Sequence, residues 1–185
     1  MNALEIQIVK LSLNSSKYSI VYLTVNDAER LQELYDKCTD YALLVDGQLP
    51  SSTAAREEFY ALPDGKSLAD KIMLGILNPQ KKIIGLIESI VQYPDSKTLW
   101  IGLIMLHPDY RCKGLIKPII STMERFAISK NLSYLMGSVV EENYKVLRLW
   151  KQLGFILVRE TQPKKFAQKV QTLYIVKKSI ASSNK

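Results

Sequence analysis

The fold is decided by the segment Leu106-His107-Pro108-Asp109-Tyr110-Arg111-Cys112-Lys113-Gly114-Leu115-Ile116-Lys117, which joins an apolar run to an amphipathic one. Where a strand ends and a helix begins, several backbone N–H groups lack partners and the positive end of the helix dipole points the same way. Arg111, Lys113 and Lys117 add positive charge, and Gly114 lets an anion approach the main chain closely. The segment predicts a phosphate or pyrophosphate site. A capped helix with a solvated basic face is the alternative reading.

Apolar periodicity on both sides of this segment predicts the neighbouring elements. The helix that follows it has one apolar face, made of Ile116, Ile119, Ile120, Met123, Phe126 and Ala127. A later helix carries Val146, Leu149, Trp150 and Leu153 and ends at Gly154, a left-handed cap. Two helices are also expected earlier, one capped by Asn26 with Glu29 as its reciprocal partner and one over Thr53–Ala61.

Alternating or continuous apolar runs predict the strands, which are Leu4–Leu11, Tyr18–Leu23, Lys71–Leu77, Ile83–Tyr93, Leu99–Leu106, Tyr134–Val140, Phe155–Thr161 and Val170–Lys177. Asn14-Ser15-Ser16-Lys17 reads as the turn between the first two strands. This order indicates a mixed α/β layer in which helices cover a sheet. We expect residues 1–180 to form a single domain and residues 181–185 to be a frayed tail.

Composition bounds the function. The 185 residues are 47% hydrophobic and 23% charged, an average globular composition, with no apolar run long enough to span a bilayer. Two cysteines and no signal peptide indicate a reduced, cytoplasmic protein. A net charge of +7 favours anionic partners, and a single histidine leaves no His-rich metal site. We therefore expect no metal.

The segment resembles motif A of the GNAT-type N-acetyltransferases, whose pattern is Arg/Gln-x-x-Gly-x-Gly/Ala between a strand and a helix. Arg111, Gly114 and Ile116 occupy those positions, after the His-Pro-x-Tyr run of His107 to Tyr110. Downstream, Glu142-Asn143-Tyr144 and Leu149-Trp150-Lys151-Gln152-Leu153-Gly154-Phe155 resemble a later motif of the family. The resemblance implies a GNAT-like fold. Its sheet would be central, mostly antiparallel and twisted, with splayed central strands and about four flanking helices.

The resemblance also implies a cofactor, acetyl-coenzyme A (acetyl-CoA), bound between the splayed strands. Its pyrophosphate would lie on the backbone amides of Arg111, Cys112, Lys113, Gly114, Leu115, Ile116 and Lys117. Its pantetheine arm would pair with backbone groups of Met105 and Leu106. Asn143 would reach the cofactor from the second helix. An acceptor amine would attack the thioester directly, with help from a base or water chain to deprotonate the ammonium, N–H donors for the oxyanion and an acid for the departing thiolate.

Two residues depart from the family pattern. Ile116 replaces the last small residue of motif A, and we expect its side chain to crowd the pyrophosphate. Trp150 stands where many members carry a tyrosine acid, and an indole N–H is not a usable acid. Tyr144 lies six positions earlier on the helix and is expected to point elsewhere.

Glu88 is the candidate base. By alternation it shares a strand face with Ile84, Leu86 and Ile90, where desolvation should raise the pKa of its carboxyl. The alternative is a structural ion pair with a lysine or arginine. His107 and Cys112 are interpreted as structural residues of the turn. An acidic set expected to wall the acceptor site comprises Asp40, Glu57, Glu58, Asp64 and Asp70.

The sequence therefore predicts a cytoplasmic acetyltransferase acting on a primary amine of a small molecule or peptide, as a monomer or homodimer. One alternative is a degenerate domain that binds acyl-CoA with little turnover, suggested by Ile116 and Trp150. Another is a nucleic-acid binder, suggested by charge alone, although the exposed aromatics of a single-strand binder are missing. We expect neither nucleic acid nor membrane as a partner.

Overall fold

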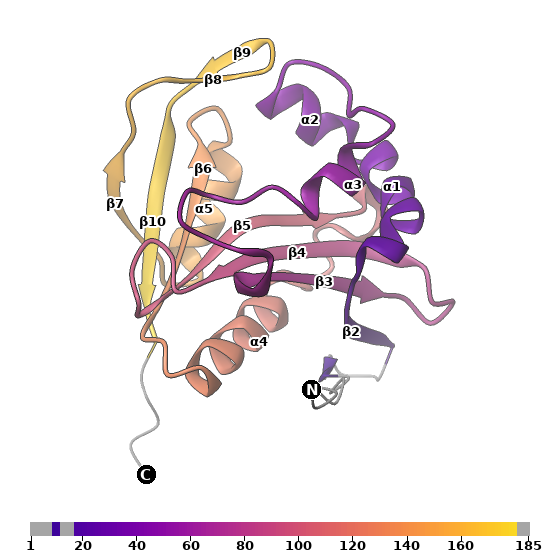
Figure 1. Cartoon of the computed structure of the whole chain (residues 1–185), viewed down its shortest axis with the longest axis horizontal. Coiled ribbons are helices and arrows are strands. Elements are labelled where there is room, and N and C mark those ends of the chain that lie inside the picture. The colour runs from indigo at the N-terminus through magenta and orange to yellow at the C-terminus, as the bar shows by residue number, and fades with distance from the viewer. Residues whose placement is uncertain (1–8, 12–16, 181–185) are drawn as a thin grey trace.

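The computed structural model describes residues 9–11 and 17–180. In this part of the chain, eight strands form one sheet in the order β1-β2-β3-β4-β5-β6-β10-β7, and β8 and β9 form a separate hairpin (Figure 1). The strands of the sheet are β1 (Val9–Leu11), β2 (Tyr18–Tyr22), β3 (Lys71–Leu77), β4 (Ile83–Val91), β5 (Thr98–Leu106), β6 (Tyr134–Val140), β7 (Ile156–Glu160) and β10 (Leu173–Ser179). The hairpin strands are β8 (Lys164–Phe166) and β9 (Lys169–Gln171).

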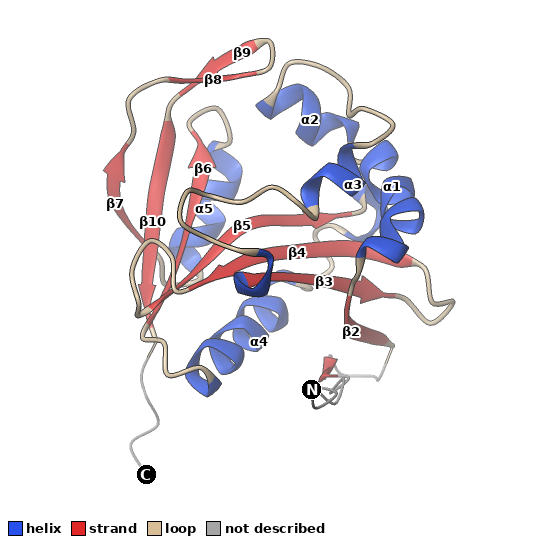
Figure 2. Cartoon of the chain, viewed as in Figure 1, coloured by secondary structure: helices blue, strands red, loops and turns tan. Residues whose placement is uncertain are grey.

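Helices cover both faces of the sheet (Figure 2). They are α1 (Ala28–Lys37), α2 (Thr39–Val45), α3 (Ala54–Glu58), α4 (Ile116–Ser129) and α5 (Tyr144–Gln152), with 3-10 turns η1 (Val25–Asp27), η2 (Leu68–Asp70) and η3 (Pro108–Tyr110). Residues of α4 and α5, such as Ile119 and Trp150, pack in one buried cluster. Residues of α1 and α3, such as Leu31 and Ala55, pack in a second cluster with other side chains of the sheet.

The centre of the sheet is where its strands part. Strands β1 to β5 pair antiparallel in sequence order, and β10 pairs antiparallel with both β6 and β7. Strands β5 and β6 pair in parallel, but only from Thr98↔Tyr134 to Ile101↔Gly137. Beyond Ile101, β5 stays on β4 while β6 stays on β10, so the sheet opens between them. The expected mixed sheet with splayed central strands is confirmed.

Most expected elements lie where the apolar periodicity puts them, and β3 and β6 match their expected bounds. The Asn26 cap is wrong, because Thr24 and Asp27 form the capping box and α1 begins at Ala28. Helix α2 and the β8–β9 hairpin were not expected. Most of the expected strand Leu4–Leu11, most of the turn from Asn14 and the tail 181–185 lie outside the described residues.

Candidate active site

The loop between η3 and α4 presents a run of free backbone donors. Arg111 N–H donates to Pro108 C=O over 3.1 Å. Among the described residues, the six amides from Cys112 to Lys117 find no acceptor. Cys112 (φ 56°) and Gly114 (φ 75°) have left-handed backbone conformations, and the segment that contains them leads into α4, which begins at Ile116. Because the helix N-terminus adds its positive dipole end, the loop is built to hold an anion.

The basic side chains of this loop make different contacts. Arg111 Nε donates to Leu106 C=O over 2.9 Å, and its guanidinium forms a two-point ion pair with Asp40 at the start of α2. This pairing holds the pKa of the Asp40 carboxyl below its ordinary value. Lys113 lies over the Tyr110 ring, with Nζ 5.3 Å from the ring centre. Arg111 therefore fastens the loop, while Lys113 and the exposed Lys117 stay near the free amides.

The side chain of Ile116 is partly buried and packs against the core cluster under α4. Leu115 before it is buried almost completely, with 2% of its surface exposed. The expectation that Ile116 crowds an anion on the loop has no support in this packing, because the side chain contributes to the hydrophobic core.

The open edge of β5 offers backbone groups beside this loop. His107 N–H donates to Ile84 C=O, and main-chain groups alternate in direction along a strand, so Met105 also faces β4. By the same alternation, Ile104 and Leu106 face the opening. Leu106 C=O already accepts from Arg111 Nε and, over 3.4 Å, from the Cys38 thiol. Leu106 N–H and the Ile104 amide group are therefore the free edge, and the register does not favour Met105.

On the far side of the opening, α5 presents Asn143 at its N-terminus. Asn143 Oδ1 accepts from Val146 N–H over 3.4 Å, which leaves the side-chain amide nitrogen free for another partner. Trp150 is 8% exposed, packs edge-to-face on Phe155 with ring centres 4.3 Å apart, and lies in the core. Tyr144 is 62% exposed on the first turn, as expected. Trp150 is thus a core residue.

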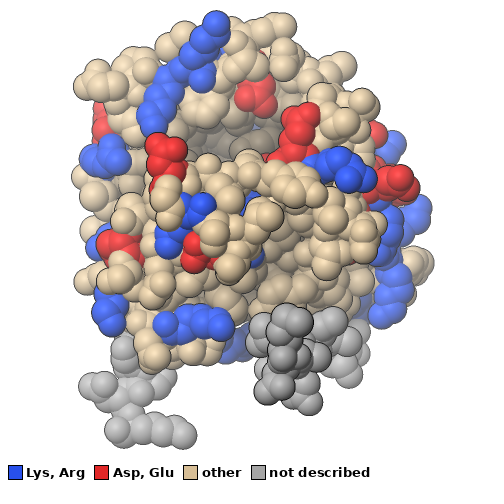
Figure 3. All heavy atoms as spheres, in the orientation of Figure 1, with Lys and Arg blue, Asp and Glu red and all other residues tan. Residues whose placement is uncertain are grey.

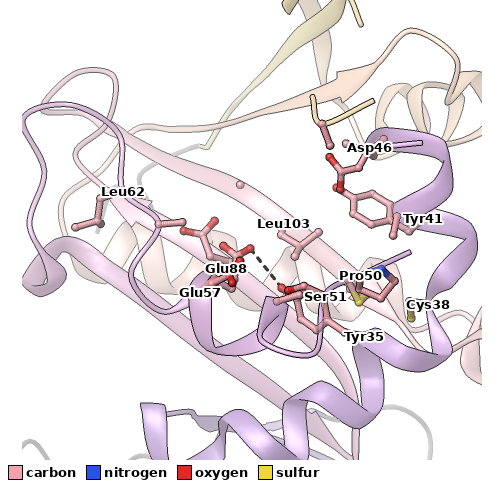
Figure 4. A pocket seen from close by; sticks show the side chains of 18 of the residues that line it. Tyr35, Cys38, Tyr41, Asp46, Pro50, Ser51, Glu57, Leu62, Glu88 and Leu103 are labelled. Atoms are coloured by element: carbon pink, nitrogen blue, oxygen red, sulfur yellow. Dashed lines mark hydrogen bonds between the residues drawn. The ribbon is translucent and has the colours of Figure 1, made fainter. Parts of the chain in front are cut away.

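A cavity of about 670 Å³ lies over β4 and β5 on the side of α1 to α3 (Figure 4). Figure 3 shows a hollow in this face with acidic side chains at its rim. Four carboxylates line the cavity, namely Asp46, Glu57, Glu58 and Glu88, together with one basic side chain, Lys71. Four rings line it as well, those of Tyr35, Tyr41, Tyr93 and Trp100. An acidic, aromatic cavity suits a cation.

The expected acidic wall is right for Glu57 and Glu58, and the sequence missed Asp46 and Lys71. Asp40, Asp64 and Asp70 do not line the cavity. Asp40 pairs with Arg111, and Asp70 caps η2 through the Ser67 N–H. Asp46 would have been found only with α2, since it directly follows that helix.

The end of α2 and the β8–β9 hairpin, which are far apart in the sequence, together form one side of the cavity, which we call its roof. Lys169 Nζ donates to Leu44 C=O over 3.1 Å, and Gln171 Nε2 donates to Leu44 C=O over 2.7 Å and to Val45 C=O over 3.3 Å. These carbonyl groups belong to the last turn of α2, where a helix supplies no N–H donors for them. The β8–β9 hairpin thereby holds the end of α2 in place, and its Ala167 lines the cavity.

Glu88 lies in the cavity wall, 4% exposed, on β4. It shares its face with Leu86 and Ile90, but not with Ile84, because an irregularity between Ile76 and Leu77 turns Ile84 towards α4. Lys71 Nζ donates to Glu88 Oε1 over 2.9 Å. Burial raises the pKa of Glu88 above its ordinary value, and the Lys71 charge opposes that rise. The expected desolvation and the alternative ion pair are both present.

Two further side chains have the structural roles expected of them. His107 Nδ1 accepts from Asp109 N–H over 3.2 Å and caps η3. The Cys112 side chain is exposed in the loop, and its backbone is left-handed. None of the helices in the described residues combines the length and apolarity that crossing a bilayer requires.

A family model described as the acetyltransferase (GNAT) family matches residues 28–155. The chain belongs to this family. It is therefore an acetyl-CoA-dependent acyltransferase, as motif A and the later motif implied. A search of curated proteins found no significant match.

Solved structures share the fold. An acetyltransferase from Thermus thermophilus aligns with a TM-score of 0.70 and 18% identity, covering 88% of this chain and 97% of that one. A spermidine N-acetyltransferase from Vibrio cholerae, in complex with CoA and spermine, aligns with a TM-score of 0.69 and 18% identity, covering 90% and 97%. At 18% identity, these similarities show that this chain shares the fold of the two structures.

Proposed function

We propose that this GNAT enzyme transfers the acetyl group of acetyl-CoA to a primary amine of a small cationic acceptor. The observation that carries the proposal is the run of six free amides from Cys112 to Lys117, directly beside the opening between β5 and β6. The acidic cavity starts where the strands part, at Gly102, so cofactor and acceptor would meet there.

The residues present fit the cofactor. The free amides, the Gly114 turn and Lys113 and Lys117 match a pyrophosphate in charge and in donors. Leu106 N–H, the Ile104 amide group and the Asn143 side-chain amide would hold the pantetheine arm. Once bound, acetyl-CoA supplies the activated thioester at the opening.

The acceptor is proposed from the charge of the cavity. Four carboxylates against one lysine leave it with an excess of negative charge, which attracts an ammonium group. The Vibrio cholerae neighbour, a spermidine N-acetyltransferase crystallised with spermine, supports an aliphatic polyamine as the first acceptor to test.

Glu88 is the proposed base. Its carboxylate takes one proton from the acceptor ammonium, and the freed nitrogen pair forms the new N–C bond while the C–S bond breaks with its electrons on sulfur. The nitrogen loses its second proton as the amide forms, and water would carry that proton to the departing thiolate, because the buried indole of Trp150 cannot serve as the acid.

The cofactor site is tested with Gly114→Val, measured by calorimetry with acetyl-CoA. The β-branched side chain is strained at φ 75° and closes the approach to the amides, so we expect affinity to fall at least about tenfold, or ~1.4 kcal/mol. Gly65→Val is the matched control, since Gly65 has φ 77° and equally open surroundings outside the site. Equal affinity in both variants would show that the pyrophosphate binds elsewhere.

The base is tested with Glu88→Gln, assayed by thiol release with a panel of amines. One positioned base contributes roughly 100- to 10,000-fold, so turnover at neutral pH should fall at least about tenfold, with partial rescue at high pH. Cofactor affinity should stay nearly unchanged. Unaltered turnover in Glu88→Gln would mean that ordered water and backbone carbonyls, and not Glu88, deprotonate the acceptor ammonium.

The two alternatives fit less well. A non-catalytic acyl-CoA binder rested on Ile116 and Trp150, and both side chains have roles in the core. A nucleic-acid binder would need its positive charge to be concentrated at the binding site, whereas the cavity is acidic. Acetyl-CoA should raise the melting temperature of the protein, and nucleic acid should leave it unchanged.

A further inference from the structure

Lys71, the first residue of β3, has its ammonium group inside the cavity wall. Its side chain is 3% exposed, and Nζ donates to Glu88 Oε1 over 2.9 Å, to Glu58 Oε1 over 3.3 Å and to Ala61 C=O over 2.7 Å. Three acceptors satisfy the three protons of an ammonium group. These three hydrogen bonds fix the position of the ammonium group in the cavity wall.

The two oxygens of Glu88 face different groups. Oε1 is bound to Lys71, whereas Oε2 lies over Gly102, so close that a side chain at Gly102 would overlap it. Gly102 is the extra residue of an irregularity in β5 opposite Glu88 and Ser89, and it directly follows Ile101, the last residue of β5 that pairs with β6. One oxygen is thereby anchored and the other points to the place where the strands part.

We propose that Lys71 is a positioning residue that keeps Glu88 ionised and aims its Oε2 at the opening between β5 and β6. The inference rests on the proposed function, in which Glu88 accepts the proton of the acceptor ammonium. Without a fixed cation beside it, a buried carboxylate takes up a proton and ceases to be a base.

The charges around Glu88 leave Lys71 as the balancing cation. Glu58 from α3 adds a second carboxylate, and it also accepts from the Tyr35 hydroxyl of α1 over 3.3 Å. The remaining titratable side chains of the cavity are acidic or neutral, namely Glu57, Asp46, Tyr41, Tyr93 and Cys38. Burial and the Glu58 charge both raise the pKa of Glu88, and among the described residues that line the cavity only Lys71 is basic.

The test is the pH dependence of kcat/KM in Lys71→Met, with acetyl-CoA and the best amine of the panel. Glu88 must be ionised to act, so kcat/KM falls as the pH drops through the pKa of Glu88. Removing an opposite charge at this distance raises such a pKa, so we expect the midpoint of the acid limb to move up by about one to three pH units. Above that midpoint, kcat should return to within about threefold of the parent.

Two variants separate charge from structure. Lys71→Arg keeps the cation and should keep the midpoint near that of the parent. Lys66→Met is the matched control, because Lys66 pairs with Asp70 outside the cavity, and it should leave the profile unchanged. Since Lys71→Met leaves the buried Glu88 and the partly buried Glu58 without their shared counter-ion, the double variant Lys71→Met/Glu58→Gln removes one carboxylate and protects folding, which is checked by the melting temperature.

The outcomes are distinct. A lower melting temperature with an unmoved midpoint, in Lys71→Met compared with the parent or in the double variant compared with Glu58→Gln alone, would make Lys71 merely structural and overturn the inference. The profile of Glu88→Gln decides the underlying proposal. If Glu88→Gln retains the acid limb and full turnover, Glu88 is not the base, and the role of Lys71 fails with it. If only Glu88→Gln loses activity, Glu88 remains the base and Lys71 does not position it.

Discussion

At Ile116 the side chain packs against the core, while the backbone amide remains available to the proposed cofactor site. The side chain is partly buried against the cluster under α4, and the amide is one of the six free donors. Since the donor is a backbone group, the residue type affects binding only through the backbone path.

Ile116→Gly therefore should keep the acetyl-CoA affinity within about twofold. Its cost should appear in stability. Glycine in a helix costs about 1 kcal/mol, and losing a partly buried isoleucine side chain adds about 1–2 kcal/mol. Calorimetric titration and urea unfolding measure the two effects separately. A large affinity loss in the folded variant would mean that the side chain holds the loop in its binding conformation.

At the scale of elements, the roof of the cavity depends on hydrogen bonds between α2 and the β8–β9 hairpin. Gln171→Leu removes the donor to Leu44 and Val45 carbonyls at nearly constant volume. Each bond contributes about 1 kcal/mol, so a loosened roof should raise the KM for the amine about fivefold. The KM for acetyl-CoA should not change.

The control for the roof is Gln152→Leu, the same exchange at an exposed position of α5. Steady-state kinetics with each substrate varied in turn make the comparison. A rise in both KM values of Gln171→Leu would point to a general loss of structure, and no change in either would exclude the hairpin from acceptor binding.

These roof elements also mark the limit of what sequence periodicity could predict. Strands such as β3 and β6 carry long apolar runs, so pattern alone finds their bounds. Helix α2 has seven residues, too few to be stable alone, and its last carbonyls are satisfied by residues more than 120 positions later. No local signal records such a partner.

The same distinction applies to the site. The loop proposed to bind the pyrophosphate is a contiguous segment, and its motif is visible in the sequence from Arg111 to Ile116. The surroundings of Glu88 are not contiguous, because Lys71, Glu58 and Gly102 come from β3, α3 and β5. Irregularities at Ile84 and at Gly102 then shift the alternation by which faces are assigned. The sequence could predict a desolvated Glu88, but not the lysine that pairs with it.

For the whole molecule, net charge and site charge have opposite signs. The chain carries +7, whereas the cavity holds four carboxylates and one lysine. Basic residues near the loop would draw an anionic cofactor while the hollow seen in Figure 3 draws a cation. In the proposed reaction, the anionic cofactor and the cationic acceptor would thus be attracted to different parts of the site.

The position of β10 sets an order of events during biosynthesis. Strand β10 lies between β6 and β7, and β7 has no other partner in the described sheet. Strands β2 to β5 can pair as soon as they are made, since each contacts its neighbour in the sheet order. The far half must wait until the ribosome has released Leu173–Ser179, which then insert between two strands already present. Strand β6 pairs with β5 only from Thr98↔Tyr134 to Ile101↔Gly137, whereas β10 pairs along the whole of β6, so the far side of the proposed cofactor opening can be completed only after β10 has been made.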